Sequence, residues 1–364
     1  MSTPPSSSPA QASHPVDAAA TAKGTAIAAE ATASTAPTPA AQTAPPRGGI
    51  VAQGLRRSFG DVHAVRNMSI TAPAGQVTAL VGPNGSGKTT LLLMLASLLK
   101  PDAGSITVDG LDLAADPRAA RARLGWMPDT LGVWDALTTT EILVSVGRLY
   151  GLDKSEATTR AAELLHLVRL PDFAHRPARV LSRGQQQRLS LARALVHDPA
   201  VLLLDEPASG LDPDSRLELR DILRSLAREG RAVLVSSHDL GELDEFSDRA
   251  VFVAAGETVR EQSVVEADAA ERSYTVRSLE PAALEQALTR LGVPHTAARD
   301  DRRAARSVLL SSEADAAALL SALVAEGVPV VGFAPTSGAL EETYRRTVGA
   351  AHSTHSHAAP EETR

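Results

Sequence analysis

The sequence contains no cysteine, few aromatic residues and no long apolar run. Without cysteine the chain can form no disulfide, uses no thiolate and holds no cysteine-ligated zinc. It has no apolar stretch of about 18 residues, so no segment is predicted to cross a bilayer as a helix. A basic segment followed by an apolar one is also missing from the first residues, which argues against a secretory signal. These absences favour an intracellular protein that does not span a membrane.

The overall composition predicts an acidic protein with an aliphatic core. Hydrophobic residues make up 43% of the 364 residues and aromatic residues only 3%, so Leu, Val and Ala are expected to fill the core. The net charge is −7 and the pI is about 5.8. An acidic balance does not favour nucleic acid as a main partner.

Composition divides the chain into four segments. Residues 1–48 are mostly Ala, Pro, Ser and Thr, which bury too little apolar surface to fold, so they are predicted to form a disordered tail. Residues 49–262 are expected to form an α/β domain, with a helical insert at about 130–180. Residues 263–348 follow roughly a β-α-β-α-β pattern, which suggests a small ferredoxin-like α+β domain used for regulation or subunit contact. Residues 349–364 are predicted to be a second disordered tail, with histidines that are solvated rather than bound to metal.

A phosphate loop is the strongest local signal. The apolar stretch Gln76–Val81 predicts a buried strand, and Leu91–Leu99 predicts a helix. The residues that follow the strand match the pattern G-x-x-x-x-G-K-S/T: Gly82, Pro83, Asn84, Gly85, Ser86, Gly87, Lys88 and Thr89. Glycines let backbone N–H groups turn around a phosphate, and the helix N-terminus adds partial positive charge. Lys88 is expected to reach the β- and γ-phosphates, and the Thr89 hydroxyl to ligate Mg²⁺.

Two further apolar strands are each followed by polar residues. Val201–Leu204 leads into Asp205 and Glu206, and Ala232–Val235 is followed closely by His238. A continuous apolar strand is typical of a parallel sheet that is buried on both faces. Ligands bind at the carboxyl ends of such strands, so these side chains are candidates for a site.

Three more segments complete the pattern. Leu181–Gln185 places Ser182 as the N-cap of a helix that runs to His197. Ser209–Asp212 is predicted to be a turn before another helix. Phe59, which precedes a glycine, has two possible roles, packing in the core or stacking on a base.

In this order the motifs resemble the ATP-binding subunit of an ABC transporter, over roughly residues 49–256. The resemblance implies a P-loop NTPase core with a helical insert. It also implies that these residues bind the nucleotide of their own subunit: Phe59, Gly82, Pro83, Asn84, Gly85, Ser86, Gly87, Lys88, Thr89 and Thr90. The signature sequence, which contacts the nucleotide of a second subunit, corresponds to Ser182, Arg183, Gly184 and Gln185. Asp212 corresponds to the D-loop aspartate.

The resemblance also implies an ATPase that uses ATP and Mg²⁺. Glu206 would be the general base and His238 the switch histidine that holds the γ-phosphate and the base in line. Thr89 and Asp205 would ligate Mg²⁺. Asp129 is a weaker candidate for a metal ligand, because the family usually has a glutamine at that position.

The partners implied are a second ATP-binding subunit and a separate membrane permease. ATP would join two subunits head to tail, as a homodimer or a heterodimer, on the inner face of the cell membrane. Pro335–Tyr344 resembles the ending of export-type subunits, which suggests efflux. The alternatives are a non-transport ABC ATPase of DNA repair or translation and a nucleotide-binding scaffold without hydrolysis. The permease selects the substrate, so this sequence does not identify it.

The apolar segment Leu131–Leu137 contains Trp134 and follows the loop of Asp129. Two interpretations are open. Trp134 either packs in the core or anchors a cytoplasmic helix of the permease, since aromatic residues are frequent at binding hot spots.

Overall fold

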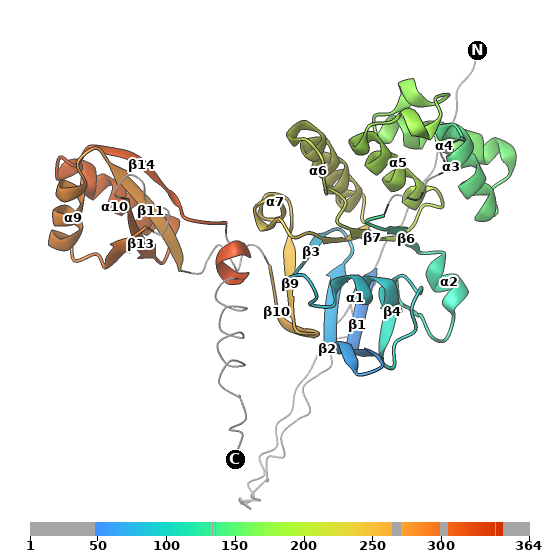
Figure 1. Cartoon of the computed structure of the whole chain (residues 1–364), viewed down its shortest axis with the longest axis horizontal. Helices are drawn as coiled ribbons and strands as arrows, with labels where there is room; N and C mark the ends of the chain where they lie inside the picture. The colour runs from blue at the N-terminus through green and yellow to red at the C-terminus, as the bar shows by residue number, and fades with distance from the viewer. Residues whose placement is uncertain are drawn as a thin grey trace, which may run out of the picture. The chain divides into compact units, whose positions relative to one another are not determined.

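The computed structural model describes residues 48–130, 132, 134, 136–263, 271–298, 305–338 and 340–344, which form two sheets with their helices (Figure 1). Both predicted tails, apart from Gly48, lie outside these residues. So do Leu131, Val133 and Asp135, and the end of the helix predicted from Leu340 to Val348. Within the described part, no helix is both long and apolar enough to cross a membrane.

The larger sheet has ten strands in the order β5-β4-β1-β2-β10-β9-β3-β8-β7-β6. Its central strands β9, β3, β8, β7 and β6 are parallel to their neighbours in this set, whereas β1, β2, β4 and β5 pair in antiparallel fashion. The strand bounds are β1 Gly49–Phe59, β2 Val62–Pro73, β3 Val77–Val81, β4 Ala103–Val108, β5 Leu111–Asp112, β6 Leu124–Met127, β7 Val201–Asp205, β8 Ala232–Ser236, β9 Arg249–Ala254 and β10 Glu257–Ser263.

Three helices of this part begin at a capping box that the sequence supplies. Thr138, Asp153 and Ser182 each form a capping box at the start of α3, α4 and α5, which satisfies backbone N–H groups of the first turn. The N-cap predicted at Ser182 is therefore confirmed. The helix bounds are α1 Lys88–Leu95, α2 Pro117–Arg121, α3 Thr139–Leu149, α4 Lys154–Leu167, α5 Arg183–Leu195, α6 Pro213–Arg228 and α7 Leu240–Asp244, with short 3-10 turns at Pro171–Phe173 and Ala178–Val180.

The central strands are apolar on both faces because helices and strands cover both. Along β3, Val77, Ala79 and Val81 join the cluster that contains residues of α3 to α6. Leu80 points the other way, into the cluster that contains α1 and the antiparallel strands. Figure 1 shows α3, α4, α5 and α6 on one side of the sheet and α1 on the other. This double burial is the arrangement predicted from the continuous apolar strands.

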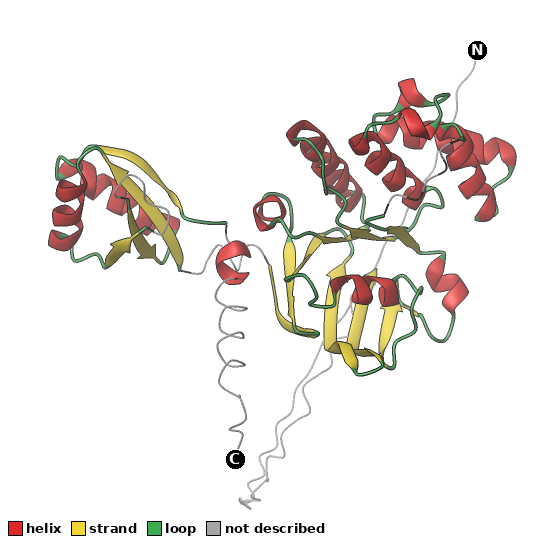
Figure 2. Ribbon diagram, viewed as in Figure 1, coloured by secondary structure: helices red, strands yellow, loops and turns green. Residues whose placement is uncertain are grey.

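The smaller sheet has four antiparallel strands in the order β12-β13-β11-β14. Its elements are β11 Arg272–Ser278, α9 Pro281–Arg290, β12 His295–Ala297, β13 Arg306–Leu310, α10 Glu313–Ala325 and β14 Val330–Pro335. They follow each other as βαββαβ, which is the ferredoxin-like order (Figure 2). Their apolar side chains form a separate buried cluster. The predicted pattern lacked only β12. The predicted division of the chain at residues 262 and 263 stays a prediction.

Candidate functional site

Three neighbouring parallel strands carry the predicted motifs to one edge of the sheet. β3 leads into the phosphate loop, β7 ends at Asp205, and β8 ends at Ser236, two residues before His238. Asp205 pairs with Ser236 in the β7–β8 register, and Leu80 of β3 pairs with the same Ser236 on the other side. The shared strand direction therefore places all three motifs together at the carboxyl edge.

Glycine is required in the phosphate loop by the space around it. At Gly82 a Cβ would overlap the carbonyl oxygen of Val253, and at Gly87 it would lie 2.5 Å from the carbonyl oxygen of Ala64. Gly87 also has φ of 99°, a left-handed conformation that favours glycine, and it precedes the first residue of α1. The loop is thus held tightly against β2 and β9 while its backbone turns into the helix.

Lys88 is folded back onto its own loop. Its Nζ donates hydrogen bonds to the carbonyl oxygens of Gly82 at 2.8 Å and Pro83 at 3.2 Å. Burial lowers the pKa of Lys88, and the nearby carboxylates of Glu206 and Asp205 partly oppose this effect. A charged ammonium group is therefore buried at the position where phosphate charge would stabilise it.

A buried hydroxyl of the same loop also fits a phosphate. Ser86 is 2% exposed, and its Oγ has no hydrogen-bond partner within the described part of the chain. Buried polar atoms are normally paired, so an unpaired one in a glycine loop indicates a place for a ligand.

The Asp205 carboxylate is buried and surrounded by hydroxyl donors. It is 4% exposed, and Ser236 Oγ donates to Asp205 Oδ1 at 2.6 Å. Burial raises the pKa of Asp205, the negative charges of Glu206 and Asp129 raise it further, and hydrogen bonds from Ser236 and Thr89 oppose the rise. The electrostatic influence of Asp129 shows that this exposed loop residue lies near Asp205. Hard oxygen donors of this type suit Mg²⁺.

Glu206 and His238 form a direct pair. Glu206 Oε2 and His238 Nδ1 are 2.7 Å apart, with the Glu206 side chain 19% exposed and that of His238 65% exposed. Glu206 has φ of 50°, which is unusual for a residue with a side chain. Its backbone N–H donates to the carbonyl oxygen and the Oγ of Ser236 at 3.2 and 3.0 Å, and these bonds hold the strained residue in place.

The signature segment lies at the exposed start of α5. Ser182 Oγ accepts from the Gln185 N–H at 3.3 Å, and Gln185 Oε1 accepts from the Ser182 N–H at 2.9 Å. Arg183 Nε donates to the Ser209 carbonyl oxygen at 3.2 Å, which ties the signature segment to the turn that follows β7. Gly184 is buried, and a Cβ there would lie 3.0 Å from Ser215 Oγ. The exposed face of this segment is available to a second subunit.

Asp212 caps α6. It accepts hydrogen bonds from the N–H of Ser215 at 2.9 Å and from its Oγ at 2.7 Å, and these bonds lower the pKa of Asp212. Asp212 therefore has a local structural role at the start of α6.

Phe59 is 48% exposed, with the Arg57 guanidinium 4.9 Å from its ring centroid. The interpretation of Phe59 as a core residue is therefore wrong. The ring lies outside the hydrophobic core and is accessible, so it is suited to stacking on a base.

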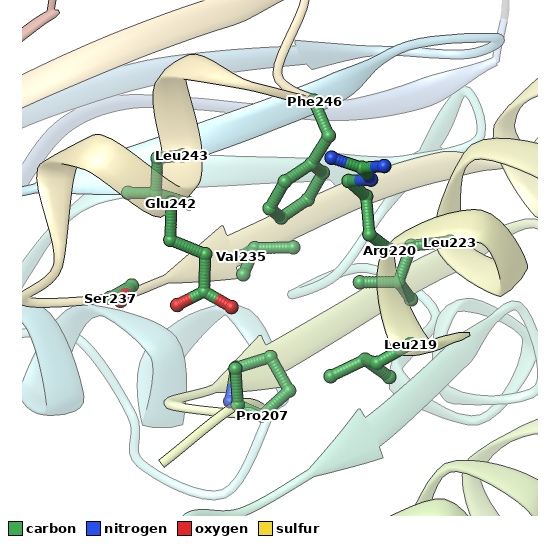
Figure 3. Close-up of a pocket in the computed structure, with 10 residues that line it drawn as sticks. Pro207, Leu219, Arg220, Leu223, Val235, Ser237, Glu242, Leu243 and Phe246 are labelled. Atoms are coloured by element: carbon green, nitrogen blue, oxygen red, sulfur yellow. The ribbon is translucent and has the colours of Figure 1, made fainter. Parts of the chain in front are cut away.

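Three residues near the site were not among the predicted ones. Ser236 donates to Asp205, and Gln187 Nε2 donates to the Glu206 carbonyl oxygen at 3.2 Å. Glu242 of α7 points its carboxylate into a small pocket that Pro207 and Ser237 also line (Figure 3). Ser236 could have been identified as a site residue because it is a polar residue at the end of β8. Nothing in the neighbouring sequence marks Gln187 or Glu242 as site residues.

Burial raises the pKa of Glu242. The positive Arg216 lowers it, the negative Asp239 and Glu206 raise it, and His238 lowers it. Glu242 is thus in electrostatic contact with both members of the Glu206–His238 pair.

Comparison with known proteins agrees with this arrangement. A family model described as ABC transporter matches residues 65–209. The ABC transporter ATP-binding protein NatA of Bacillus subtilis is 39% identical over 199 residues, which are 54% of this chain and 81% of NatA. This chain belongs to the ATP-binding proteins of ABC transporters. Members of the family hydrolyse ATP, so the chain is an ABC ATPase subunit that dimerises and works with a membrane component.

Other relatives of this ABC ATPase are named for resistance or export. The daunorubicin/doxorubicin resistance ATP-binding protein DrrA of Streptomyces peucetius is 38% identical, and the match covers 59% of this chain and 66% of DrrA. The Nod factor export ATP-binding protein I of Burkholderia lata is also 38% identical, over 57% of this chain and 69% of the relative. These names give no support to the alternative of a DNA repair or translation factor.

Solved structures show the same fold. The dimeric structure of a bacterial ABC transporter cassette has a TM-score of 0.54 and 28% identity, and it covers 59% of this chain and 98% of the cassette. A post-hydrolysis cassette dimer bound to ADP and Pi has a TM-score of 0.54, 27% identity and the same coverage. The P-loop NTPase core predicted from the motifs is confirmed.

Proposed function

We propose that this subunit binds Mg²⁺-ATP at its interface with a second ATP-binding subunit and uses ATP hydrolysis to drive export through a separate permease. The observation that carries the proposal is the 2.7 Å contact between Glu206 and His238, beside Lys88 and Asp205 at one sheet edge. This combination supplies a phosphate cradle, a metal ligand and a general base in one place.

The phosphate loop and Phe59 would bind the nucleotide. The backbone N–H groups of the loop, the Lys88 ammonium and the start of α1 would hold the phosphates, and the exposed ring of Phe59 would stack on adenine. Release of Lys88 from the carbonyl oxygens of Gly82 and Pro83 would accompany phosphate binding.

The residues around Asp205 fit Mg²⁺. Among the described residues there is no cluster of three or more His, Cys, Asp or Glu that could enclose a metal. Mg²⁺ needs no such cluster, because it commonly uses one or two protein ligands together with substrate phosphates and water. Thr89 and Asp205 would hold the ion, with Asp129 contributing directly or through water. The ion would neutralise charge on the phosphates during transfer.

The pair Glu206 and His238 would carry out proton transfer and positioning. Glu206 would accept a proton from the attacking water, and His238 would hold the carboxylate in line with the γ-phosphate. Gln187 and Ser236 would hold the backbone of Glu206 in its strained conformation.

The second subunit would complete the site. Ser182, Arg183, Gly184 and Gln185 lie at the exposed start of a helix, where N–H groups and the helix dipole favour a γ-phosphate. The proposal is a head-to-tail dimer, as a homodimer or a heterodimer, located on the inner face of the membrane.

A surface for the permease is expected near Trp134. Trp134 is partly buried against the helical cluster, and the Arg193 guanidinium lies 5.4 Å from its ring centroid. Arg193 also lines a pocket of about 250 Å³ with Trp126, Tyr150 and His197. A permease helix that inserts here would contact the segment that follows Asp129, so the nucleotide site and the membrane partner would be coupled. The export direction rests on the names of the relatives.

Glu206→Gln is the direct test. This variant is expected to bind ATP with unchanged affinity, to lose ~10²–10⁴-fold in turnover, and to accumulate as an ATP-bound dimer. Steady-state ATPase assays and size-exclusion chromatography with and without Mg²⁺-ATP measure these effects. Turnover within twofold of the wild type would exclude Glu206 as the general base.

A further inference from the structure

The short helix α7 follows His238 in the chain, just as β8 precedes it. Asp239, the residue after His238, caps α7 by accepting from the Glu242 N–H at 3.2 Å, and its own N–H donates to Ser237 Oγ at 3.0 Å. The His238 side chain is 65% exposed, so its position depends on the backbone on either side. On one side that backbone is β8, within the sheet. On the other side it is α7.

A helix as short as Leu240–Asp244 is not stable alone and depends on its tertiary contacts. Arginines of α6 supply one set of them. Arg216 lies 3.5 Å from the Asp239 carboxylate, and Arg220 lies 2.6 Å from that of Glu245. These ion pairs are partly exposed, so each contributes little. Arg224 of α6 also donates to the Glu245 carbonyl oxygen at 2.9 Å, and Leu243 is fully buried in the cluster that includes residues of α6.

Residues 338 and 340–344 supply the second set. The Leu340 N–H donates to Asp244 Oδ1 at 2.8 Å, across 96 residues of sequence. Leu340 is fully buried in the same apolar cluster as Leu243. Thr343 Oγ1 accepts from Gln262 Nε2 at 3.0 Å, and both of these side chains are buried. Asp244 therefore accepts from a backbone N–H at the start of a helical turn that lies far away in the chain.

The absence of a side chain at Gly338 permits this contact. A Cβ at Gly338 would overlap Oδ2 and Cγ of Asp244, so the carboxylate that accepts from the Leu340 N–H would have to shift. The backbone of Gly338 has no positive φ that would itself demand glycine. Close approach to α7 is thus the reason for glycine here.

We propose that residues 338 and 340–344 position the hydrolytic pair: by docking on Asp244 they hold α7, and through α7 they hold His238 against Glu206. The inference rests on the proposed roles of Glu206 and His238. Asp244 and Leu340 contact no reacting atom in this scheme. They are positioning residues that couple the C-terminal part of the chain to ATP turnover.

The test compares two substitutions of Asp244 in the full chain. Asp244→Ala removes the acceptor for the Leu340 N–H and is expected to lower kcat for ATP at least tenfold, with the Kd for ATP unchanged. Asp244→Asn keeps an oxygen that can accept from the Leu340 N–H, so this variant is expected to stay within about threefold of wild-type kcat. Ser312→Ala is the matched control, because it removes the N-cap of α10 without touching α7. It is expected to retain wild-type kcat.

Gly338→Ala provides an independent variant that leaves α7 unchanged in sequence. It is expected to lower kcat at least tenfold, as Asp244→Ala is. This variant therefore still tests the proposal if Asp244→Ala does not fold. The proposal is wrong if Gly338→Ala and Asp244→Ala behave like Ser312→Ala, or if Asp244→Asn is as impaired as Asp244→Ala. His238→Ala, measured in parallel, distinguishes a failure of the proposed role of His238 from a failure of the positioning role of Asp244. If it retains normal turnover, the proposed role of His238 fails. If it loses turnover while Asp244→Ala does not, only the positioning role fails.

Discussion

Asp205 is a residue whose burial opposes folding in the absence of a ligand. The carboxylate is 4% exposed, and burial raises its pKa above the ordinary value of 3.8. Below that value the group is protonated in both the folded and the unfolded chain, and its burial costs little. As the pH rises, the unfolded chain releases the proton first, so the free energy of unfolding falls until the folded pKa is passed. Above the folded pKa of Asp205 the nucleotide-free protein therefore carries the full cost of the buried charge.

Asp205→Asn is expected to raise the Tm of the nucleotide-free protein at pH 7–8 by about 2–4 °C, the shift for roughly 1 kcal/mol in a domain of this size. The gain should disappear below about pH 4, where Asp205 is itself neutral. Thermal unfolding across this pH range measures the difference. Mg²⁺-ATP should stabilise the wild type more than the variant, and equal stabilisation would argue against Asp205 as a metal ligand.

Lys88 also carries a charge whose burial is unfavourable in the nucleotide-free protein and which is expected to bind ATP. Its ammonium is buried and donates to two carbonyl oxygens, and the charges of Glu206 and Asp205 offset only part of the cost of its burial. Lys88→Ala is expected to weaken ATP binding to the isolated subunit by at least tenfold, because a charge-assisted hydrogen bond contributes ~1.5–3 kcal/mol. Isothermal titration with ATP measures the affinity. An unchanged Kd would show that the loop binds phosphate without this lysine.

Among the helices, α4 and α5 both begin with a capping box, but only the start of α5 is expected to contact the nucleotide of a second subunit. Asp153 and Ser182 each form a capping box, but only Ser182 belongs to the signature segment. Ser182→Ala and Asp153→Ala should each lower the free energy of unfolding by ~1 kcal/mol. Only Ser182→Ala should also reduce ATP turnover, and neither should change ATP affinity in the monomer. Equal turnover in the two variants would contradict a contact across the dimer.

The helices and strands that the sequence predicted are those whose formation depends on residues within the element itself or next to it. The apolar runs of β3, β7 and β8 and the Ser182 cap of α5 act within a few residues. In contrast, β10 and α7 were not predicted. β10 has the sequence ETVREQS, which is mostly polar, and it becomes a strand by pairing with β9 and touching β2. Its hydrogen-bond partners lie on other strands, so no periodicity within the segment indicates it.

For the whole molecule, the coupling to a membrane partner can be tested at Trp134. Because this side chain is only partly buried, Trp134→Ala should cost less than the ~3–5 kcal/mol typical of a core tryptophan. Basal ATPase activity of the isolated subunit is expected to stay within twofold of wild type. Assembly with the permease and transport in reconstituted vesicles should be lost.

Leu217→Ala is the control for this experiment, since Leu217 is an exposed apolar residue of α6 at 46% exposure. It should leave assembly and transport intact. If Trp134→Ala unfolds the isolated subunit, Trp134 is a packing residue, and the permease docks elsewhere on the helical part.

The sequence by itself determined the chemistry of the site. The phosphate loop, Asp205-Glu206 and the Ser182 cap depend on residue types at short spacing, because a tight turn, a strand end or a first helical turn involves only neighbouring residues. Tertiary structure alone decided how those groups are held. Ser236 reaches Asp205, Gln187 reaches Glu206, and Leu340 reaches Asp244 from distant parts of the chain. Such contacts arise when strands pair and helices pack, and nothing within either partner segment indicates them.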